Sequence, residues 1–290
     1  MSVFNLSGNI IDKKPMFVGA VMDASSEANR FLAMKQLFDI AVKKVKRPGY
    51  TPYASEFTYA TKGIVCVLPT PSAFYEQYDL DVLYSKDSTT QSIPASTTKV
   101  MSLIAGLPYI TSIKEKVTLV SGDIESGSGN YFSAGDILTI EDIIFGMLLP
   151  SSNTCAKTFA HYCGAKILGN SEASVSSCVA AFVAEMNAKA ALIGCTDSTF
   201  TTPSGYDNAN VSTVKDMLRI TIEAASFPEI LRIWNKKAYT INIGGTNART
   251  QDITTTVANA TLEASYYIFG GKTGHITGSA DALVMVAGLK

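Results

Sequence analysis

The stretch Pro94-Ala-Ser-Thr-Thr-Lys-Val-Met-Ser-Leu-Ile-Ala105 joins a polar start to a strongly apolar second half. This pattern predicts a buried helix that begins near Ser96. Positions i and i+3 share one face of a helix, so the Lys99 amine would reach the Ser96 hydroxyl. A serine becomes a strong nucleophile when a base takes its proton, and a lysine can be that base when burial lowers its pKa. The apolar residues after Lys99 would supply the burial.

A second motif, Ser151-Ser-Asn153, follows the apolar segment that ends at Pro150. It predicts a tight loop between two helices. A hydroxyl in this loop could relay a proton to a leaving amine, and an amide could hold both the lysine and a substrate backbone. On its own, Ser-Ser-Asn is ordinary turn chemistry.

A third motif, Lys272-Thr-Gly274, follows a predicted strand over residues 266–269. A cation and a hydroxyl on an edge strand suit a carboxylate ligand, and Gly274 lets that ligand approach the backbone. Each motif alone is common in proteins. In this order they are far more specific, because Ser-x-x-Lys together with Lys-Thr-Gly marks class A β-lactamases and penicillin-binding proteins.

The composition excludes several other classes of protein. The 290 residues carry a formal net charge of -1, and 47% are hydrophobic, which indicates a folded domain without a nucleic-acid-binding charge. Zinc and other cofactors are not expected, because the chain has two histidines and five cysteines without a Cys-x-x-Cys pair. No apolar run reaches 18 residues, so no transmembrane segment is predicted. The apolar run 15–22 is too short for a convincing signal peptide.

The remaining pattern predicts one sheet whose two sequence halves are separated by a helical region. We assign no role to residues 1–24 and a single domain to residues 25–290. The sheet would use about 25–110 and 236–290, with a helical insertion over about 111–235. Expected helices cover residues 31–45, 96–105, 143–149, 153–162, 175–192 and 213–225. Expected strands cover residues 64–68, 80–84, 238–243, 266–269 and 282–287.

From about residue 64 onward, the chain resembles the serine D-alanyl-D-alanine carboxypeptidases, the low-molecular-mass penicillin-binding proteins. The resemblance is carried by Pro94-Ala-Ser-Thr-Thr-Lys99, by residues 135–142 leading into Leu148-Leu-Pro-Ser-Ser-Asn153, and by Gly271-Lys-Thr-Gly-His275. Phe200 and Gly205 match a family hallmark without obvious chemistry. The resemblance implies an α/β (α+β) fold of the β-lactamase/transpeptidase-like type. In that fold, helices flank an antiparallel sheet and an all-helical subdomain is inserted between the strands.

The resemblance also implies roles for the matching residues. Ser96 would be acylated, Lys99 would be its base, and Ser151 and Asn153 would serve proton transfer and substrate binding. The substrate carboxylate would be held by Lys272 and Thr273 beside Gly274, and the backbone N–H groups of Ser96 and His275 would form the oxyanion hole. The implied substrate is a peptidoglycan stem peptide that ends in D-Ala-D-Ala, β-lactams would be covalent inhibitors, and the implied location is extracytoplasmic.

Three departures from the family pattern stand out. Ser152 replaces the usual glycine, and no arginine follows Lys272. The family continues beyond the position of Lys290 with one more strand and a C-terminal helix. Three explanations stay open: the sheet lacks these two elements, the helix over residues 31–45 takes the place of the missing helix, or the sequence is a fragment.

Two rival functions stay open at this point. A class A β-lactamase needs a glutamate on a loop to activate the deacylating water. No acidic residue between Asn153 and Lys272 lies in a Glu-x-x-Leu-Asn context, which favours the carboxypeptidase. The other rival is a catalytically impaired muropeptide-binding protein that keeps the site but does not turn substrate over.

Overall fold

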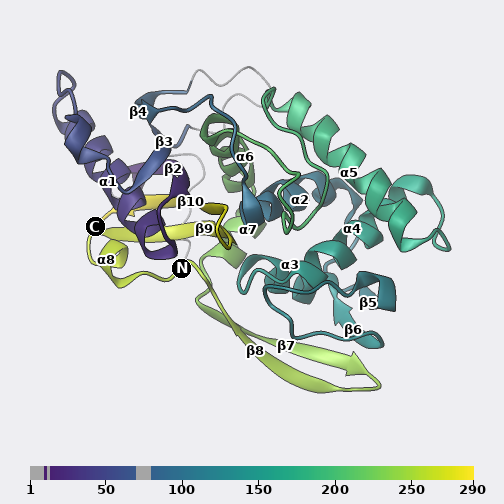
Figure 1. Ribbon diagram of the computed structural model, residues 1–290. Coiled ribbons are helices and arrows are strands. Elements are labelled where there is room, and N and C mark those ends of the chain that lie inside the picture. Colours follow the sequence, from purple (N-terminus) through teal and green to yellow (C-terminus); the bar gives the residue numbers. More distant parts are fainter. Residues whose placement is uncertain (1–9, 12–13, 70–79) are drawn as a thin grey trace.

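The computed structural model describes residues 10–11, 14–69 and 80–290 (Figure 1). Its larger sheet has the strand order β4-β3-β2-β10-β9, and every neighbouring pair in it is antiparallel. A short strand, β1, pairs with the start of β2. The strands of this sheet are β1 (Ile10–Ile11), β2 (Lys14–Ala24), β3 (Ala60–Val67), β4 (Val82–Lys86), β9 (Tyr266–Ile276) and β10 (Ala280–Leu289).

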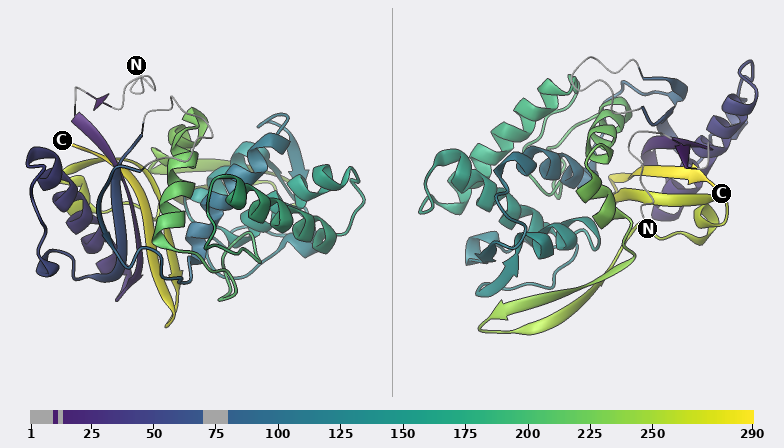
Figure 2. Two further views of the ribbon diagram at one scale, coloured as in Figure 1. Left: turned by 90° about the horizontal axis from the view of Figure 1, so that it is seen from above. Right: turned by 180° about the vertical axis from the view of Figure 1, so that it is seen from behind.

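A helical region and a smaller sheet lie between β4 and β9 in the sequence. Figure 2 shows α1 and α6 on opposite faces of the larger sheet, with α3, α4 and α5 further from it. The helices are α1 (Glu27–Lys46), α2 (Thr98–Gly106), α3 (Ile140–Leu148), α4 (Asn153–Leu168), α5 (Val175–Leu192), α6 (Val214–Ala225), α7 (Pro228–Trp234) and α8 (Ala260–Glu263). The smaller sheet has the order β5 (Lys116–Thr118), β6 (Asp136–Thr139), β7 (Ala238–Gly245) and β8 (Arg249–Thr254).

The architecture confirms the expected fold class of an antiparallel sheet with a helical insertion. The smaller sheet was not predicted, because β5 and β6 are too short to show a sequence period. The sequence assigned the predicted strand over residues 238–243 to the larger sheet, and this was wrong, because β7 pairs with β6 and β8 in the smaller sheet. Strand β9 runs through Lys272 to Ile276, although the sequence placed its end at residue 269. Two consecutive glycines, Gly270 and Gly271, suggested a strand end there, but Gly270 makes room for the Trp234 side chain.

Strand β2 corrects the division of the chain at residue 24. It is an internal strand that pairs with β10 on one side and with β3 on the other, so the sheet includes residues from Lys14 onward. Its two faces are both buried: Met16, Val18, Ala20 and Met22 join one hydrophobic cluster, whereas Phe17 and Val21 join the other. A strand buried on both faces reads as a continuous apolar run, and that is why no alternation was visible.

Helix α1 covers the face of the sheet that carries Phe17 and Val21. The Ser26 hydroxyl caps its first turn by accepting a hydrogen bond from the Asn29 backbone N–H. Its apolar face packs with β2, β3 and β10 through Phe31, Met34, Leu37, Phe38 and Ala41. Helix α1 therefore covers one face of the larger sheet, and β2 lies between β10 and β3.

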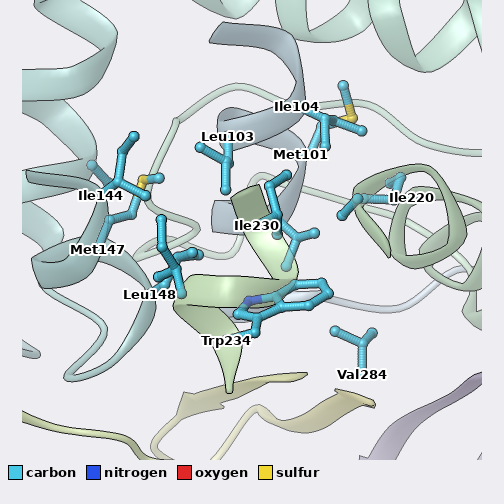
Figure 3. Packing of buried hydrophobic residues seen from close by; sticks show 14 of the residues in the cluster. Met101, Leu103, Ile104, Ile144, Met147, Leu148, Ile220, Ile230, Trp234 and Val284 are labelled. Atoms are coloured by element: carbon cyan, nitrogen blue, oxygen red, sulfur yellow. The ribbon is translucent and has the colours of Figure 1, made fainter. Parts of the chain in front are cut away.

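The opposite face of the sheet meets the helical region through a continuous core (Figure 3). Residues of α2, α3, α6 and α7 converge on β10, and the Trp234 ring lies between Ile230 and Val284 in this view. Helix α2 is buried along its whole length. The element that carries Lys99 is therefore fixed from all sides by apolar packing.

Helix α5 has the length and composition of a membrane-crossing helix, although the sequence predicted no such segment. Core helices pass the same test, and here one side of α5 packs against α2 and α4. The buried residues on that side are Cys178, Phe182, Met186 and Ala190.

Candidate active site

Ser96 lies in a short 3-10 turn, η2 (Ala95–Thr97), that leads directly into α2. The α-helix thus begins two residues later than the sequence predicted. Ala95 has a φ of 49°, in the left-handed region that residues other than glycine seldom adopt. Such strain persists only where the surroundings enforce it, and it commonly marks a functional site.

The Lys99 amine lies at the centre of the first cluster of polar groups. Its Nζ is 2.8 Å from Ser96 Oγ, 2.8 Å from Asn153 Oδ1 and 2.8 Å from the Ser204 carbonyl oxygen. The side chain is 0% exposed, and this burial lowers the pKa of Lys99 to about 7. A neutral amine has two N–H donors and one lone pair. It can donate to Asn153 and Ser204 while the lone pair faces the Ser96 hydroxyl.

The loop between α3 and α4 sets the orientation of Asn153. Its amide nitrogen donates to the Ser126 carbonyl oxygen at 2.7 Å, which leaves the amide oxygen to face Lys99. Ser152, which departs from the family's glycine, is buried and caps α4 by accepting from the Cys155 backbone N–H at 3.2 Å. Ser151 has a φ of 67°, so the backbone is strained on this side of the site as well.

Lys272 forms a second cluster of polar groups next to the first. Its Nζ donates to Ser151 Oγ and to the Thr273 carbonyl oxygen, both at 2.8 Å. Burial, and then the neighbouring Lys99 and Arg30 cations, lower the pKa of Lys272. The Thr273 hydroxyl lies 2.7 Å from that of Thr256, which orients it. The Lys272 amine is buried, and together with the Thr273 hydroxyl it can donate hydrogen bonds to a carboxylate that arrives there.

Gly274 brings β9 into direct contact with the turn that carries the serine. A Cβ at this position would lie 2.7 Å from the Pro94 carbonyl oxygen and 3.3 Å from the Ser96 backbone nitrogen. Only a glycine allows this approach. His275 follows, with its imidazole 39% exposed and Nδ1 3.0 Å from Asp281 Oδ1.

Arg30 of α1 is a residue that the sequence analysis missed. It is 5% exposed, and its Nη1 donates to the Gly274 carbonyl oxygen at 3.1 Å, 244 positions away in the chain. It also pairs with Glu27 at 3.1 Å and with Asp281 at 3.4 Å. Its spacing in the sequence could have pointed to it. Arg30 shares a helix face with Met34 and Leu37, so it places a charge on the side of the helix that faces the core.

The loop after Phe200 is the second missed element. Ser204 supplies the carbonyl oxygen that Lys99 contacts, and a Cβ at Gly205 would lie 2.0 Å from the Ala95 carbonyl oxygen. The sequence singled out Gly205 without a chemical reason. Close packing of this loop on the serine turn is that reason.

The structure therefore brings all eight predicted residues to one place. Contacts join Ser96, Lys99 and Asn153 in one cluster and Ser151, Lys272 and Thr273 in the other. Gly274 touches the backbone of Ser96, and His275 is its neighbour on β9. A hydroxyl beside a neutral amine, with a second amine nearby, can attack a carbonyl group and hold a carboxylate.

Comparisons with known proteins point the same way. The sequence model of the family described as D-alanyl-D-alanine carboxypeptidase matches residues 76–290. The D-alanyl-D-alanine carboxypeptidase DacB2 of Mycobacterium tuberculosis is 30% identical over 177 residues, which is 59% of this chain and 56% of that protein. The chain spans about half the length of the curated relatives it matches.

Solved structures show the same architecture. The crystal structure of the Streptomyces K15 DD-transpeptidase superimposes with a TM-score of 0.60 at 23% identity, over 72% of this chain and 84% of that one. A D-alanyl-D-alanine carboxypeptidase from Mycobacterium tuberculosis H37Rv has a TM-score of 0.56 at 27% identity, over 72% and 77% of the two chains.

Proposed function

Because this chain belongs to the D-alanyl-D-alanine carboxypeptidase family, we propose that it is a serine hydrolase of peptides that end in D-Ala-D-Ala. One observation carries the proposal: the Ser96 hydroxyl lies 2.8 Å from an amine that is completely buried and whose pKa is about 7. An amine with this pKa is largely neutral slightly above pH 7, so it can accept a proton as a general base. The substrate would be a peptidoglycan stem peptide, and the place of action would be outside the cytoplasm.

The first step of the reaction is acylation of Ser96. Its oxygen attacks the carbonyl carbon of the penultimate D-Ala while Lys99 takes the hydroxyl proton. The backbone N–H groups of Ser96 and His275 stabilise the negative charge that develops on the carbonyl oxygen; removing one such donor typically costs about 100-fold to 1000-fold in rate.

The second step breaks the C–N bond to the terminal D-Ala. The leaving nitrogen receives the proton through Ser151, whose hydroxyl is held by Lys272 at 2.8 Å. Lys272 and Thr273 bind the carboxylate of the leaving residue. Water then hydrolyses the ester, which returns the hydroxyl to Ser96 and releases the shortened peptide. A β-lactam would go through both of these bond changes, but its leaving nitrogen stays tethered when the ring opens, and the acyl group would remain on the serine.

Arg30 is a positioning residue in this scheme. It holds the Gly274 carbonyl oxygen and so fixes the strand that carries Thr273 and His275. It lies outside residues 76–290, the segment that the family model matches. The segment before residue 76 therefore contributes to the site.

Covalent labelling tests the proposal directly. Wild-type protein exposed to benzylpenicillin should gain the mass of one intact antibiotic, and Ser96→Ala should gain none. Ser171→Ala, at an exposed serine, is the matched control and should still be labelled. A folded wild-type protein without a mass gain would overturn the proposal in favour of a non-catalytic binder.

Nitrocefin separates the proposal from a β-lactamase. The carboxypeptidase should release about one equivalent of product per protein and then stall, because its acyl-enzyme hydrolyses slowly. Sustained rapid turnover would instead assign the chain to the β-lactamases. A synthetic D-Ala-D-Ala tripeptide should lose its last residue, with release of free D-Ala as the readout.

A further inference from the structure

Two loops flank the amine of Lys99 and meet at Tyr206. The first loop contains Ser126, whose carbonyl oxygen accepts a hydrogen bond from Asn153 at 2.7 Å. The second loop contains Ser204, whose carbonyl oxygen lies 2.8 Å from Lys99 Nζ. The first loop thus holds Asn153 and the second holds Lys99, and Tyr206 follows Ser204 by two residues.

The Tyr206 ring lies beside the Asn153 amide. A Cβ built at Gly127 would be 2.7 Å from Asn153 Nδ2 and 2.7 Å from Tyr206 Cε2. Two atoms that are each 2.7 Å from one point are at most twice that distance, 5.4 Å, apart. Gly127 has no side chain to separate them, and its φ of 97° disfavours any other residue.

The backbone under Tyr206 is firmly held. Gly205 packs against the Ala95 carbonyl oxygen, so closely that a Cβ there would lie 2.0 Å from it. The Asn210 side chain accepts from the backbone N–H groups of Thr201 and Thr202 at 2.8 and 3.0 Å. Asn210 also donates to the Thr98 hydroxyl at 3.1 Å, which ties the loop to α2.

The Tyr206 side chain itself is 49% exposed despite this rigid support. Its hydroxyl has one contact among the described residues, at 3.5 Å from Ser126 Oγ, which is at the outer limit for a hydrogen bond. A rigidly mounted aromatic ring that stays half in water is well suited to bind a ligand, because little conformational entropy is lost when it does so.

We infer that Tyr206 is a specificity-determining residue, whose ring contacts the part of the substrate that precedes the penultimate D-Ala. The inference rests on the proposed function. Lys272 and Thr273 hold the carboxyl end of the substrate. Tyr206 instead lies beside Asn153, which contacts the Lys99 amine. The ring therefore meets the acyl side of the scissile bond and favours an apolar or aromatic group there.

Two penicillins that differ only on the acyl side test this inference. Benzylpenicillin carries a phenylacetyl group, and 6-aminopenicillanic acid has the same fused rings and carboxylate with a free amine in its place. Tyr206→Ala should lower the second-order rate of Ser96 acylation by benzylpenicillin about tenfold, the worth of one aromatic contact. Its rate with 6-aminopenicillanic acid should stay within about twofold. Tyr206→Phe should behave as wild type with both.

Each other outcome overturns the inference. If Tyr206→Ala lowered the acylation rate equally with both penicillins, Tyr206 would only support its loop. If it lowered neither rate, the ring would not contact the substrate. A Tyr206→Phe loss as large as that of Tyr206→Ala would assign the effect to the hydroxyl. Tyr53→Ala, at an exposed tyrosine on the N-cap of η1 (Ala54–Glu56), is the matched control and should change neither rate. Failure of the wild type to react with either penicillin would instead refute the proposed function, and this inference with it.

Discussion

Replacement of Lys99 by methionine should change the stability of the protein by an amount that depends on pH. In the folded protein the pKa of Lys99 is about 7, whereas the ordinary value for lysine is 10.5. Unfolding therefore takes up a proton throughout this range, so the lysine destabilises the fold. The cost is absent above about pH 10.5, grows as the pH falls, and is complete below about pH 7.

The magnitude follows from these two values. The lysine costs about 5 kcal/mol at pH 6 and about 2 kcal/mol at pH 9, where the unfolded lysine is still charged and the buried one is neutral. Lys99→Met removes this cost, and it also leaves Asn153 and Ser204 without a donor, which costs about 1–3 kcal/mol for each unsatisfied group. That second cost does not change with pH. The stability of the variant relative to the wild type should therefore fall by about 3 kcal/mol from pH 6 to pH 9.

Urea unfolding at the two pH values measures this difference by linear extrapolation. Titrating groups far from Lys99 cancel in the comparison, and Lys236→Met, at an exposed lysine, should give the same small difference at both pH values. If the stability difference for Lys99→Met were the same at pH 6 and pH 9, the Lys99 amine would be charged in the folded state and its pKa would not be lowered. The variant should also form no penicillin adduct.

Three further predictions concern the site and its supports. The rate of acylation by penicillin should rise about tenfold from pH 6 to pH 8 as Lys99 loses its proton, and a flat stopped-flow profile would contradict the assigned base. Gly205→Ala should lower the acylation rate at least 100-fold, because its Cβ would lie 2.0 Å from a carbonyl oxygen of the serine turn. If the variant were labelled as fast as the wild type, the turn would be able to move aside without losing its function. Arg249→Met leaves the buried Asp136 carboxylate without its partner and should cost about 3–5 kcal/mol at pH 7 by urea unfolding. Burial raises the pKa of Asp136, but hydrogen bonds from Arg249 outweigh this and lower it. The stability lost in Arg249→Met should therefore fade below about pH 4, as Asp136 becomes protonated. A loss of the same size at that pH would exclude the ion pair.

The three motifs and the fold class were accessible from the sequence because each is local. Ser96 and Lys99 are three positions apart, and helical spacing alone brings them together. The order of strands around a helical insertion was visible in the hydrophobic pattern, and the structure confirms it.

Other parts were inaccessible because they depend on contacts between distant segments. Strand β2 carries no alternation, since both of its faces are buried, and its role becomes clear only beside β3 and β10. Arg30 reaches Gly274 across 244 positions, and Ser204 contributes a backbone atom that has no side-chain signature. Sequence periodicity records the face that a residue presents to the core, not the partner that it meets there.

The position of β2 also affects how the protein can fold during synthesis. β2, β3 and β4 emerge from the ribosome early, but β10, which must pair with the free edge of β2, follows after about 200 more residues. At typical translation rates this takes on the order of 10–40 seconds, during which that edge can recruit other chains. Because β9 and Lys272 are made in the same late stretch, the nascent protein has no carboxylate-binding side and gains its chemistry only when the last hairpin docks.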